Sequence, residues 1–440
     1  MLGKFRIKNI KIADLFKKFG QDTFSSLKIR NYRLYFIGQG ISLPGTWMQR
    51  IGQAWLVLKL TDSGTALGLV TALQFLPVLL LTPMGGVIAD RYSKRKILYF
   101  TQAGAALLAL ILAVLVETDT VRLWMIYILA AIFGVINSID NPARQTFVFE
   151  MVGRKELRNA VTLNSTEINL ARVIGPAIAG AIIAGAGLAL CFFINALSYV
   201  GVLVCLFLIN SQELYAAEPV KKMKGQLREG FSYVWNTPVL RNVLIMMAIA
   251  GTLTYEFEVS LPLIAKFTFH GNAGDYALLT SAMGIGAVLG GLATASRRKT
   301  KSNEIIVTLF AFGTAVLLTA ISPGLHLSII TMVIVGVFSI KFMTLGNTTL
   351  QLESAPEMRS RVMSLWTIAF LGSTPIGGPI IGWVSEHTNP RIGLAVSGFA
   401  AIAAGLFGLI VMKNRQKANT AETEGKLAAE GNYPDSKKAV

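Results

Sequence analysis

The chain has 440 residues, of which 53% are hydrophobic and only 15% are charged, and its mean hydropathy is +0.56. Soluble proteins carry about 25% charged residues, and a soluble fold of this length cannot bury so much apolar surface. The composition therefore excludes a soluble enzyme, a disordered protein and a secreted disulfide scaffold. It predicts an all-α integral membrane protein, because a bilayer can solvate apolar helices.

Apolar segments long enough to cross a bilayer recur along the chain. We expect twelve transmembrane helices, with the ranges 34–58, 63–89, 97–116, 123–141, 158–186, 188–209, 240–265, 275–295, 304–323, 327–350, 361–385 and 392–412. The sequence predicts five regions: a basic N-terminal segment (1–33), a six-helix bundle (34–209), a central loop (210–239), a second six-helix bundle (240–412) and a disordered tail (413–440).

The basic residues are distributed unevenly over the connecting segments. Alternate loops and both terminal segments hold most of the 41 lysines and arginines, whereas the other loops hold only Lys59, Arg122, Lys266 and Arg391. The positive-inside rule then predicts that both termini, the central loop and the tail lie in the cytoplasm. We expect a multi-pass protein of the cell membrane, the inner membrane of the cell. We interpret the net charge of +17 as this topology signal plus attraction to anionic lipid, and expect no nucleic-acid partner.

Two motifs recur with one offset. The run Ser93-Lys94-Arg95-Lys96 returns as Ser-Arg-Arg-Lys at 296–299, and Gly175-Pro176 returns as Gly378-Pro379, each 203 residues later. Duplicated halves are typical of secondary transporters, whose substrate site lies between the halves near the bilayer midplane. Because six spans separate the copies, the sequence predicts two bundles of the same orientation, related by a pseudo-two-fold repeat.

The loop Gly86-Val-Ile-Ala-Asp90-Arg91-Tyr-Ser-Lys94-Arg95-Lys96 resembles the signature that follows the second span in the major facilitator superfamily. The resemblance extends from residue 31 to about residue 410, and the chain also resembles the enterobactin-exporter-like, drug-efflux branch of this superfamily. The other stretches of sequence that show this resemblance are Asn31-Tyr-Arg-Leu-Tyr, Gly45-Thr-Trp47-Met-Gln-Arg50, Asp140-Asn-Pro-Ala-Arg144-Gln, Arg172-Val-Ile-Gly-Pro176 and Arg359-Ser-Arg361-Val-Met. It implies an exporter whose two bundles rock about a central site, driven by the proton gradient.

The chain departs from that pattern at three places. Ser93 replaces the usual glycine of the loop signature, and the second-half copy has Ala293 and Thr294 where the first has Asp90 and Arg91. The predicted fourth span, 123–141, carries no arginine, although many proton-coupled drug exporters have one there. These departures weaken the inference of a proton-relay mechanism.

The loop signature and a residue of the fourth span are expected to form a conformational latch. Asp90 can accept hydrogen bonds at the N-terminus of a neighbouring helix, where the helix dipole favours an anion. The resemblance implies that this helix is the eleventh span and that the latch closes the cytoplasmic side of the outward-facing state. Gly86 would allow close helix approach, and Lys94 would pair with Asp140. The expected latch residues are Gly86, Asp90, Arg91, Lys94, Arg95 and Asp140. The alternative is that the four cations of the loop, Arg91, Lys94, Arg95 and Lys96, report topology alone.

Gly175 and Pro176 lie inside the fifth span, where proline removes a backbone hydrogen bond and glycine lets another helix approach. We expect a helix kink at this pair, and the resemblance associates such a motif with efflux. Ordinary packing of small residues is the alternative.

Polar side chains recur at steps of three and four along the first, fifth and tenth spans, which places them on one face of each helix. Since a polar face is costly against lipid, these faces should line a wet cavity. Tyr255 and Trp47 would stack there on an amphipathic substrate, although core packing is the alternative. The expected cavity residues are Gln39, Thr46, Gln49, Arg50, Gln53, Asn169, Arg172, Tyr255, Lys341 and Thr344.

Three carboxylates inside predicted spans are candidates for proton coupling: Glu256, Glu258 and Glu167. Glu256 and Glu258 are two residues apart, so they point about 200° away from each other on a helix. A buried carboxylate needs a partner or a proton. We therefore expect one of the two to pair with Arg50 and to exchange protons during the cycle, and a static salt bridge is the alternative.

The sequence predicts a secondary active transporter that exports a small amphipathic molecule, a siderophore or a drug-like compound, by proton antiport. An importer or facilitator with the same fold is the alternative. Phosphate-loop, H-E-x-x-H and G-x-S-x-G patterns do not occur in the sequence, and we expect neither an enzyme, nor a cofactor, nor a metal site. Arg50, Arg172 and Lys341 would suit an anionic catechol siderophore, whereas the span-seven carboxylates would suit a cationic drug. The expected partners are this substrate, protons and the lipid bilayer, and we expect a monomer.

Overall fold

The computed structural model describes residues 24–215, 226–295 and 303–431, and the regular elements in these ranges are all helices. In chain order they are η1 (Ser25–Lys28), α2 (Arg30–Thr61), α3 (Gly64–Arg91), α4 (Lys94–Glu117), α5 (Leu123–Ala186), α6 (Leu188–Leu208), η2 (Ser211–Glu213), α7 (Gln226–Asn236), α8 (Pro238–Leu253), α9 (Phe257–Leu263), η3 (Ile264–Thr268), α10 (Ala273–Ala295), α11 (Glu304–Ala320), α12 (Leu325–Glu353), α13 (Arg359–Leu371), α14 (Thr374–His387) and α15 (Pro390–Gly431). The all-α class predicted from composition is confirmed.

The helices make twelve passes. Within the described ranges, nine helical stretches are long and apolar enough to cross a membrane. The 64-residue α5 supplies two passes, because Gly153 interrupts it with φ 64° and ψ −176°. Two further passes complete the set: α2, whose polar face lowers its hydropathy, and the 17-residue α11. The chain thus forms the predicted twelve-helix membrane fold.

The two arms of α5 fold back on each other along α2. Arg144 of the first arm bonds to Gln39, while the Ala160 carbonyl of the second arm accepts from the Tyr32 hydroxyl at 2.8 Å. Glycine at position 153 permits this reversal because its φ lies in the left-handed region. The predicted fourth span therefore ends too early at residue 141, and Arg144 lies inside the bundle rather than in a loop.

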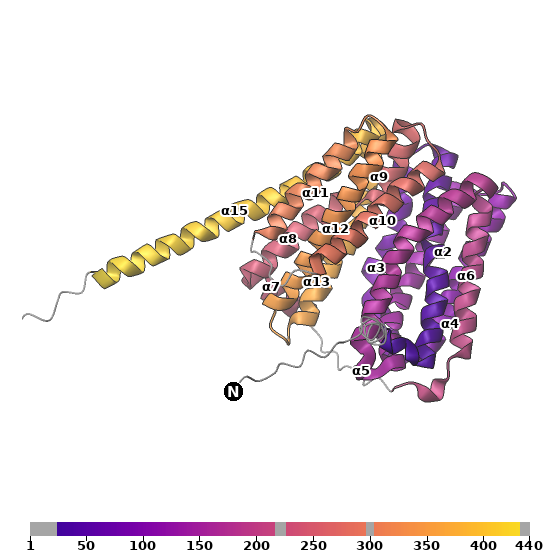
Figure 1. Cartoon of the computed structure of the whole chain (residues 1–440), viewed down its shortest axis with the longest axis horizontal. Coiled ribbons are helices and arrows are strands. Elements are labelled where there is room, and N and C mark those ends of the chain that lie inside the picture. The colour runs from indigo at the N-terminus through magenta and orange to yellow at the C-terminus, as the bar shows by residue number, and fades with distance from the viewer. Residues whose placement is uncertain (1–23, 216–225, 296–302, 432–440) are drawn as a thin grey trace, which may run out of the picture.

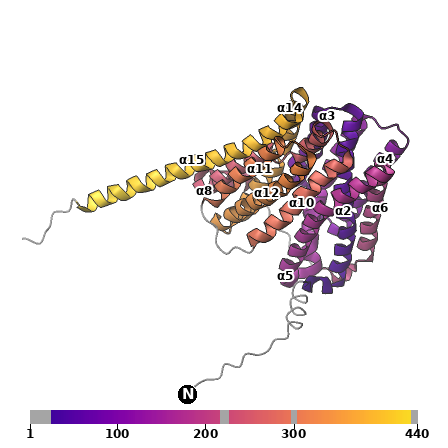
Figure 2. The same cartoon turned by 45° about the horizontal axis from the view of Figure 1, so that its top comes forward.

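The six-helix halves lie side by side, as Figure 1 shows by the indigo-to-magenta and the orange bundles. One end of the molecule carries the α3–α4 turn (92–93) and the α12–α13 turn (354–358), and we call it the basic end. The other, the opposite end, carries the α2–α3 turn (62–63) and the α14–α15 turn (388–389). Figure 2 shows the same two bundles after a 45° turn.

The halves meet along two seams that correspond under the repeat. In one seam α3 packs on α14, and in the other α10 packs on the second arm of α5. A Cβ on Gly68 would lie 2.4 Å from the Gly378 carbonyl oxygen, and a Cβ on Gly180 would lie 2.9 Å from the Ala277 Cβ. Because span two meets span eleven and span eight meets span five, the contacts obey the pseudo-two-fold relation predicted from the repeated motifs.

Backbones approach closely inside each half as well. A Cβ on Gly286 of α10 would lie 1.9 Å from the Val333 carbonyl oxygen of α12, and one on Gly85 of α3 would lie 2.0 Å from the Ser138 carbonyl oxygen of α5. Lipid tails are as apolar as leucine, so helices in a bilayer associate through such close van der Waals contact. The glycine-rich strings in the sequence are thus helix-packing surfaces.

Two breaks inside helices and one helix end differ from the sequence prediction. The seventh span is broken between α8 and α9, and the eleventh is broken between α13 and α14, near a Gly372-Ser373 step. The segment expected to be a disordered tail from residue 413 is helical as far as Gly431, and α15 projects away from the bundles in Figure 1. Its composition explains the difference, because Ala, Glu, Lys and Gln favour helix without tertiary contacts. Residues 1–23, 216–225, 296–302 and 432–440, which include the second copy of the basic motif and part of the central loop, lie outside the described ranges.

Candidate functional site

An ion pair joins the two halves at their interface. Arg50 of α2 donates from Nη1 to Oε1 of Glu258 in α9 at 2.7 Å, and the two side chains keep 26% and 33% exposure. The pairing of Arg50 with one of the two span-seven carboxylates, expected from the sequence, is therefore present, and Glu258 is the partner. A charge pair that remains partly solvated can open without the full cost of stripping two ions of water.

The ring of Trp47 contacts two guanidinium groups. The Arg50 Cζ is 4.7 Å from the centre of the Trp47 ring, and the Arg172 Cζ of α5 is 5.1 Å from it. Gly175 makes this arrangement possible, since a Cβ there would lie 2.5 Å from the Trp47 Cβ and 2.6 Å from the Pro44 carbonyl oxygen. The backbone dihedrals stay helical at Gly175 and Pro176, so they do not by themselves show the kink expected there. The kink remains a prediction.

The cluster of Arg50, Trp47, Arg172 and Glu258 carries two cations and one carboxylate, and we call it the guanidinium site. Its residues come from both halves: α2 and α5 on one side and α9 on the other. Nε of Arg50 and of Arg172 are both buried without a hydrogen-bond partner among the described residues. The site therefore holds an excess positive charge and unused donors beside an aromatic face, a combination that suits a planar anion.

Glu256 lies where the two broken spans meet. Its side chain is only 1% exposed, and a Cβ on Gly377 of α14 would lie 2.8 Å from Glu256 Oε1. The same Cβ would lie 1.5 Å from the Thr252 carbonyl oxygen at the end of α8. Oε1 of Glu256 has no hydrogen-bond partner in the described part of the chain. Discontinuous helices mark ion and substrate sites in many transporters, and a buried carboxylate at such a break is a candidate proton carrier.

Several residues expected to line the cavity instead bond within their own half. Gln39 is 2% exposed and accepts from Arg144, Thr46 bonds to the Tyr199 hydroxyl at 3.2 Å, and Gln49 accepts from Asn195 at 2.5 Å. The polar face of α2 therefore splits. Its first part ties the helix to α5 and α6, and its last part, around Arg50, reaches the other half.

The remaining expected cavity residues are dispersed. Lys341 forms an ion pair with Glu304 of α11 at 3.0 Å, and the Tyr255 hydroxyl donates to the Ser339 carbonyl oxygen at 2.9 Å. Asn169 donates to the Ser165 carbonyl oxygen of its own helix at 2.8 Å. Gln53 and Thr344 are half-buried. These contacts place Lys341 and Tyr255 in the second half's own polar and aromatic packing.

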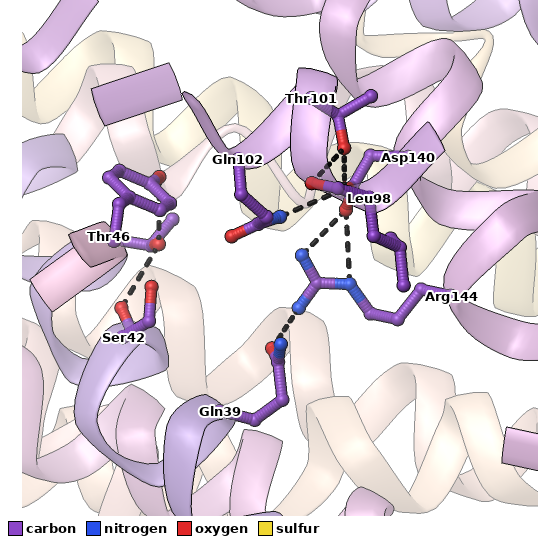
Figure 3. A network of polar contacts seen from close by, with 9 residues as sticks. Gln39, Ser42, Thr46, Leu98, Thr101, Gln102, Asp140 and Arg144 are labelled. Atoms are coloured by element: carbon purple, nitrogen blue, oxygen red, sulfur yellow. Dashed lines mark hydrogen bonds and ion pairs between the residues drawn. The ribbon is translucent and has the colours of Figure 1, made fainter. Parts of the chain in front are cut away.

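Figure 3 shows a buried polar network in the first half, centred on Asp140. Asp140 Oδ2 accepts from Arg144 Nη2 at 2.6 Å and from Nε at 3.0 Å, while Oδ1 accepts from Thr101 at 2.6 Å and from Gln102 at 2.8 Å. The carboxylate is 1% exposed. The expected Lys94–Asp140 pair is wrong. Asp140 lies deep in the bundle and pairs with Arg144, one turn further along the same helix, while Lys94 pairs with Glu150.

Glu167 lies near this network with both carboxylate oxygens buried and without a hydrogen-bond partner among the described residues. A Cβ on Gly40 would lie 3.0 Å from Glu167 Oε1. Arg144 was missed as a functional residue because the span was predicted to end before it. The i,i+4 spacing of Asp140 and Arg144, typical of a helical ion pair, was the signal that could have identified it.

The loop-signature residues lie at the basic end. Lys94 pairs with Glu150 of α5 at 3.0 Å, and Arg95 donates to the carbonyl oxygens of Leu206 and Phe207, each at 3.0 Å. Gly86 is half-buried, and Asp90 and Arg91 are exposed. Gly85, the neighbour of Gly86, makes a close approach to α5, and the close approach expected of Gly86 stays a prediction. Lys94 and Arg95 thus fasten α4 to α5 and α6 within one half, and the latch remains a prediction.

Polar contacts close the opposite end across the two halves. Lys266 donates to the Leu58 carbonyl oxygen at 2.7 Å and pairs with Asp62. Glu386 Oε2 accepts from the Ser63 hydroxyl and from the Thr65 backbone N–H, each at 2.8 Å. Sequence patterns do not predict this closure, because its residues lie at helix ends and in the α2–α3 turn, and the partners are more than 200 positions apart.

The chain matches known transporters over most of its length. The family model described as transmembrane secretion effector matches residues 21–431. The Staphyloferrin A transporter of Staphylococcus aureus (strain NCTC 8325 / PS 47) is 26% identical over 349 residues, which cover 78% of this chain and 87% of that protein. The enterobactin exporter EntS of Shigella flexneri is 24% identical over 387 residues, which cover 87% and 91%.

Solved structures agree on the fold. A point mutant of the nucleoside transporter NupG superposes with a TM-score of 0.70 at 15% identity, covering 88% of this chain and 99% of that one. A bacterial homologue of the iron transporter ferroportin in an inward-facing state gives 0.68 at 15% identity, covering 87% and 98%. The chain is therefore a multi-pass membrane transporter and not an enzyme, and it belongs to the transmembrane secretion effector family of the major facilitator superfamily.

Proposed function

We propose that this transporter exports an anionic, partly aromatic chelator of the siderophore class by proton antiport. The observation that carries the proposal is the guanidinium site, where two arginines from separate helices contact Trp47 and, within the site as described, one carboxylate, Glu258, faces these two cations. Carboxylate and catecholate groups accept paired N–H hydrogen bonds from guanidinium groups, and an aromatic ring can stack on the planar guanidinium groups beside Trp47. The siderophores named for two relatives support this class.

We place the basic end in the cytoplasm, following the positive-inside rule. The polar contacts of Lys266 and Glu386 then close the outside, and the guanidinium site, whose ion pair keeps partial exposure, faces the cytoplasm. This is the state that an exporter needs in order to load substrate. An incoming anion competes with Glu258 for Arg50, so substrate binding weakens a contact between α2 and α9.

Glu256 is the proposed proton carrier. It lies buried in the seam that α14 forms with α3 and α8. An enclosed carboxylate with an unbonded oxygen is costly while charged, so closure of the seam on the outside requires a proton on Glu256. A proton taken up from outside is then carried inward when the empty transporter returns. Glu167 beside Arg144 is a second proposed proton site.

The test uses lipid vesicles into which the purified transporter is reconstituted in the everted orientation, so that its basic end faces the outer solution. The lumen is acidic, and a pH-sensitive dye reports the gradient. We add polycarboxylate chelators, catechol chelators and lipophilic cations one at a time. We expect the anionic chelators to dissipate the gradient only when the protein is present. A response to the cations alone contradicts the proposed substrate class. Movement of labelled chelator without any dye response contradicts antiport and favours the facilitator or importer alternative.

A matched pair of variants isolates the site. Arg172→Gln should weaken chelator binding by about 10- to 100-fold, since a charge-assisted hydrogen bond contributes about 1.5–3 kcal/mol. Arg122→Gln, an exposed arginine at the opposite end, should leave binding unchanged. Equal affinities of Arg172→Gln and Arg122→Gln would remove the guanidinium site from the proposal.

A further inference from the structure

The short helix α7, outside the membrane passes, exposes two large aromatic side chains. Phe231 is 55% exposed and Trp235 is 53% exposed, and their rings stack with centroids 5.6 Å apart at an interplanar angle of 20°. They are four residues apart, which places them on one face of the helix. The side of α7 that packs against the bundle is buried, and Val234 on that side is 4% exposed. The helix is thus amphipathic, with an aromatic face that the described residues do not cover.

Specific contacts fix α7 to the second half at the basic end. Glu229 pairs with Arg361 at the start of α13 at 2.6 Å, and the Tyr233 hydroxyl accepts from the Ala355 backbone N–H at 3.1 Å. A Cβ on Gly230 would lie 2.9 Å from the Arg361 Cβ. Figure 1 shows α7 beside α13 and α8 at that end. The aromatic face therefore has a defined orientation relative to the bundle.

Cationic side chains border the aromatic face. Arg228 is exposed, and Arg241 of α8 places its Cζ 5.7 Å from the centre of the Trp235 ring. Arg241 also donates to the Trp235 carbonyl oxygen at 3.3 Å. In the sequence, Lys221, Lys222 and Lys224 immediately precede the helix. Aromatic rings beside Lys and Arg at the end of membrane helices are the chemistry that binds the headgroup region of an anionic leaflet.

We infer that α7 is a membrane-surface anchor, whose Phe231 and Trp235 insert into the interfacial region while Arg228 and Arg241 bind anionic phospholipid headgroups. A water-facing pair of stacked rings would be unfavourable, whereas the leaflet solvates rings and accepts hydrogen bonds from guanidinium groups. Because α7 is tied to α13, the anchor holds the basic end of the second half at the membrane surface while the other half moves. The proposal is independent of the transported substrate.

The test measures the fluorescence of Trp235 in the full-length protein in vesicles. Brominated lipids quench only the tryptophans that they touch, and the difference between the wild type and Trp235→Phe isolates one ring. We compare vesicles that contain brominated phosphatidylglycerol with vesicles that contain brominated phosphatidylcholine at the same mole fraction. Trp124, 58% exposed at the start of α5 and at the opposite end, gives the matched control through Trp124→Phe.

We expect the Trp235 signal to be quenched at least twofold more by the anionic lipid, and the Trp124 signal to be quenched equally by both. The preference should disappear in 1 M salt and in Arg228→Gln/Arg241→Gln, because each cation near an anionic surface strengthens binding by about fivefold. The salt experiment decides the question even if the double variant does not fold. A Trp235 signal untouched by either lipid, or quenched equally by both, overturns the proposal.

Discussion

At the residue scale, burial of charge determines which contacts the molecule depends on. Asp140 is 1% exposed and is bonded by Arg144, Thr101 and Gln102, so both of its carboxylate oxygens have donors. Neutral neighbours provide two of those bonds, and one cation balances the charge. Glu256 and Glu167 are the counterexamples, since Oε1 of Glu256 and both carboxylate oxygens of Glu167 are buried without a hydrogen-bond partner among the described residues. A buried carboxylate whose oxygens all accept hydrogen bonds stabilises the fold. A buried carboxylate with an unbonded oxygen is suited to take up a proton.

Removal of Asp140 should therefore be severe. Asp140→Ala leaves the Arg144 guanidinium buried without its counter-ion, and we expect a loss of about 3–5 kcal/mol in folding stability. Thr101→Val, which removes one neutral donor from the same carboxylate, should cost about 1 kcal/mol. Thermal unfolding in detergent, followed by circular dichroism, measures both. Equal losses in the two variants would show that the ion pair does not stabilise the bundle.

Glu256→Gln should uncouple transport from protons. The neutral amide imitates the protonated side chain, so the seam beside Gly377 can close without a proton. We expect exchange of labelled substrate across the membrane to continue and the substrate-induced dye response to fall at least tenfold. Glu213→Gln in the exposed η2 turn is the control and should behave like the wild type. A normal dye response in Glu256→Gln would exclude this residue as the proton carrier.

At the element scale, close helix packing depends on glycines whose neighbours are backbone atoms. In α10, a Cβ on Gly286 would lie 1.9 Å from the Val333 carbonyl oxygen, while one on Gly291 would meet nothing within 4 Å. The reciprocal contact is equally tight, because a Cβ on Gly336 of α12 would lie 2.0 Å from the Met283 carbonyl oxygen. A backbone atom cannot rotate away, so these helices can be this close only while both positions remain glycine.

The two glycines of α10 give a matched prediction. Gly286→Ala should destabilise the protein by about 1–3 kcal/mol, since the helices must separate to admit the methyl group. Gly291→Ala should be neutral or stabilising by up to about 1 kcal/mol, because alanine is the better helix former. The midpoints of detergent unfolding for the two variants provide the measurement. Equal midpoints would show that the α10–α12 contact tolerates an added side chain.

At the scale of the whole molecule, the described contacts between halves join helices that the repeat makes equivalent, and polar pairs close one end. The α3–α14 and α5–α10 seams exchange under the pseudo-two-fold, so one rocking motion can loosen both. Lys266 with Asp62, and Glu386 with Ser63, lie at the opposite end. Transport by rocking requires these pairs to separate, whereas pairs within one half move together.

Crosslinking distinguishes the two kinds of pair. In a protein with Cys191 and Cys205 replaced by serine, Ser63→Cys/Glu386→Cys treated with a short, reducible thiol crosslinker should block transport at least tenfold, and reductant should restore it. Ser25→Cys/Glu156→Cys is the control, because the native Ser25 hydroxyl bonds to Glu156 at 2.5 Å within one half. That pair should crosslink without loss of transport. Full transport through the crosslinked 63–386 pair would contradict rocking of the halves.

The sequence by itself determined the membrane class, the twelve passes and the two-fold arrangement of the halves. Hydropathy is a local property of each segment, and a repeated motif can be recognised without knowing which helices touch. It also identified Arg50 and the pair Glu256 and Glu258 as charges that need partners. Only the tertiary structure decided that Glu258 takes Arg50, that Asp140 takes Arg144 and not Lys94, and that Lys266 and Glu386 close one end. These partners lie on different helices or beyond a predicted helix end, and helical periodicity specifies a face without specifying what it meets.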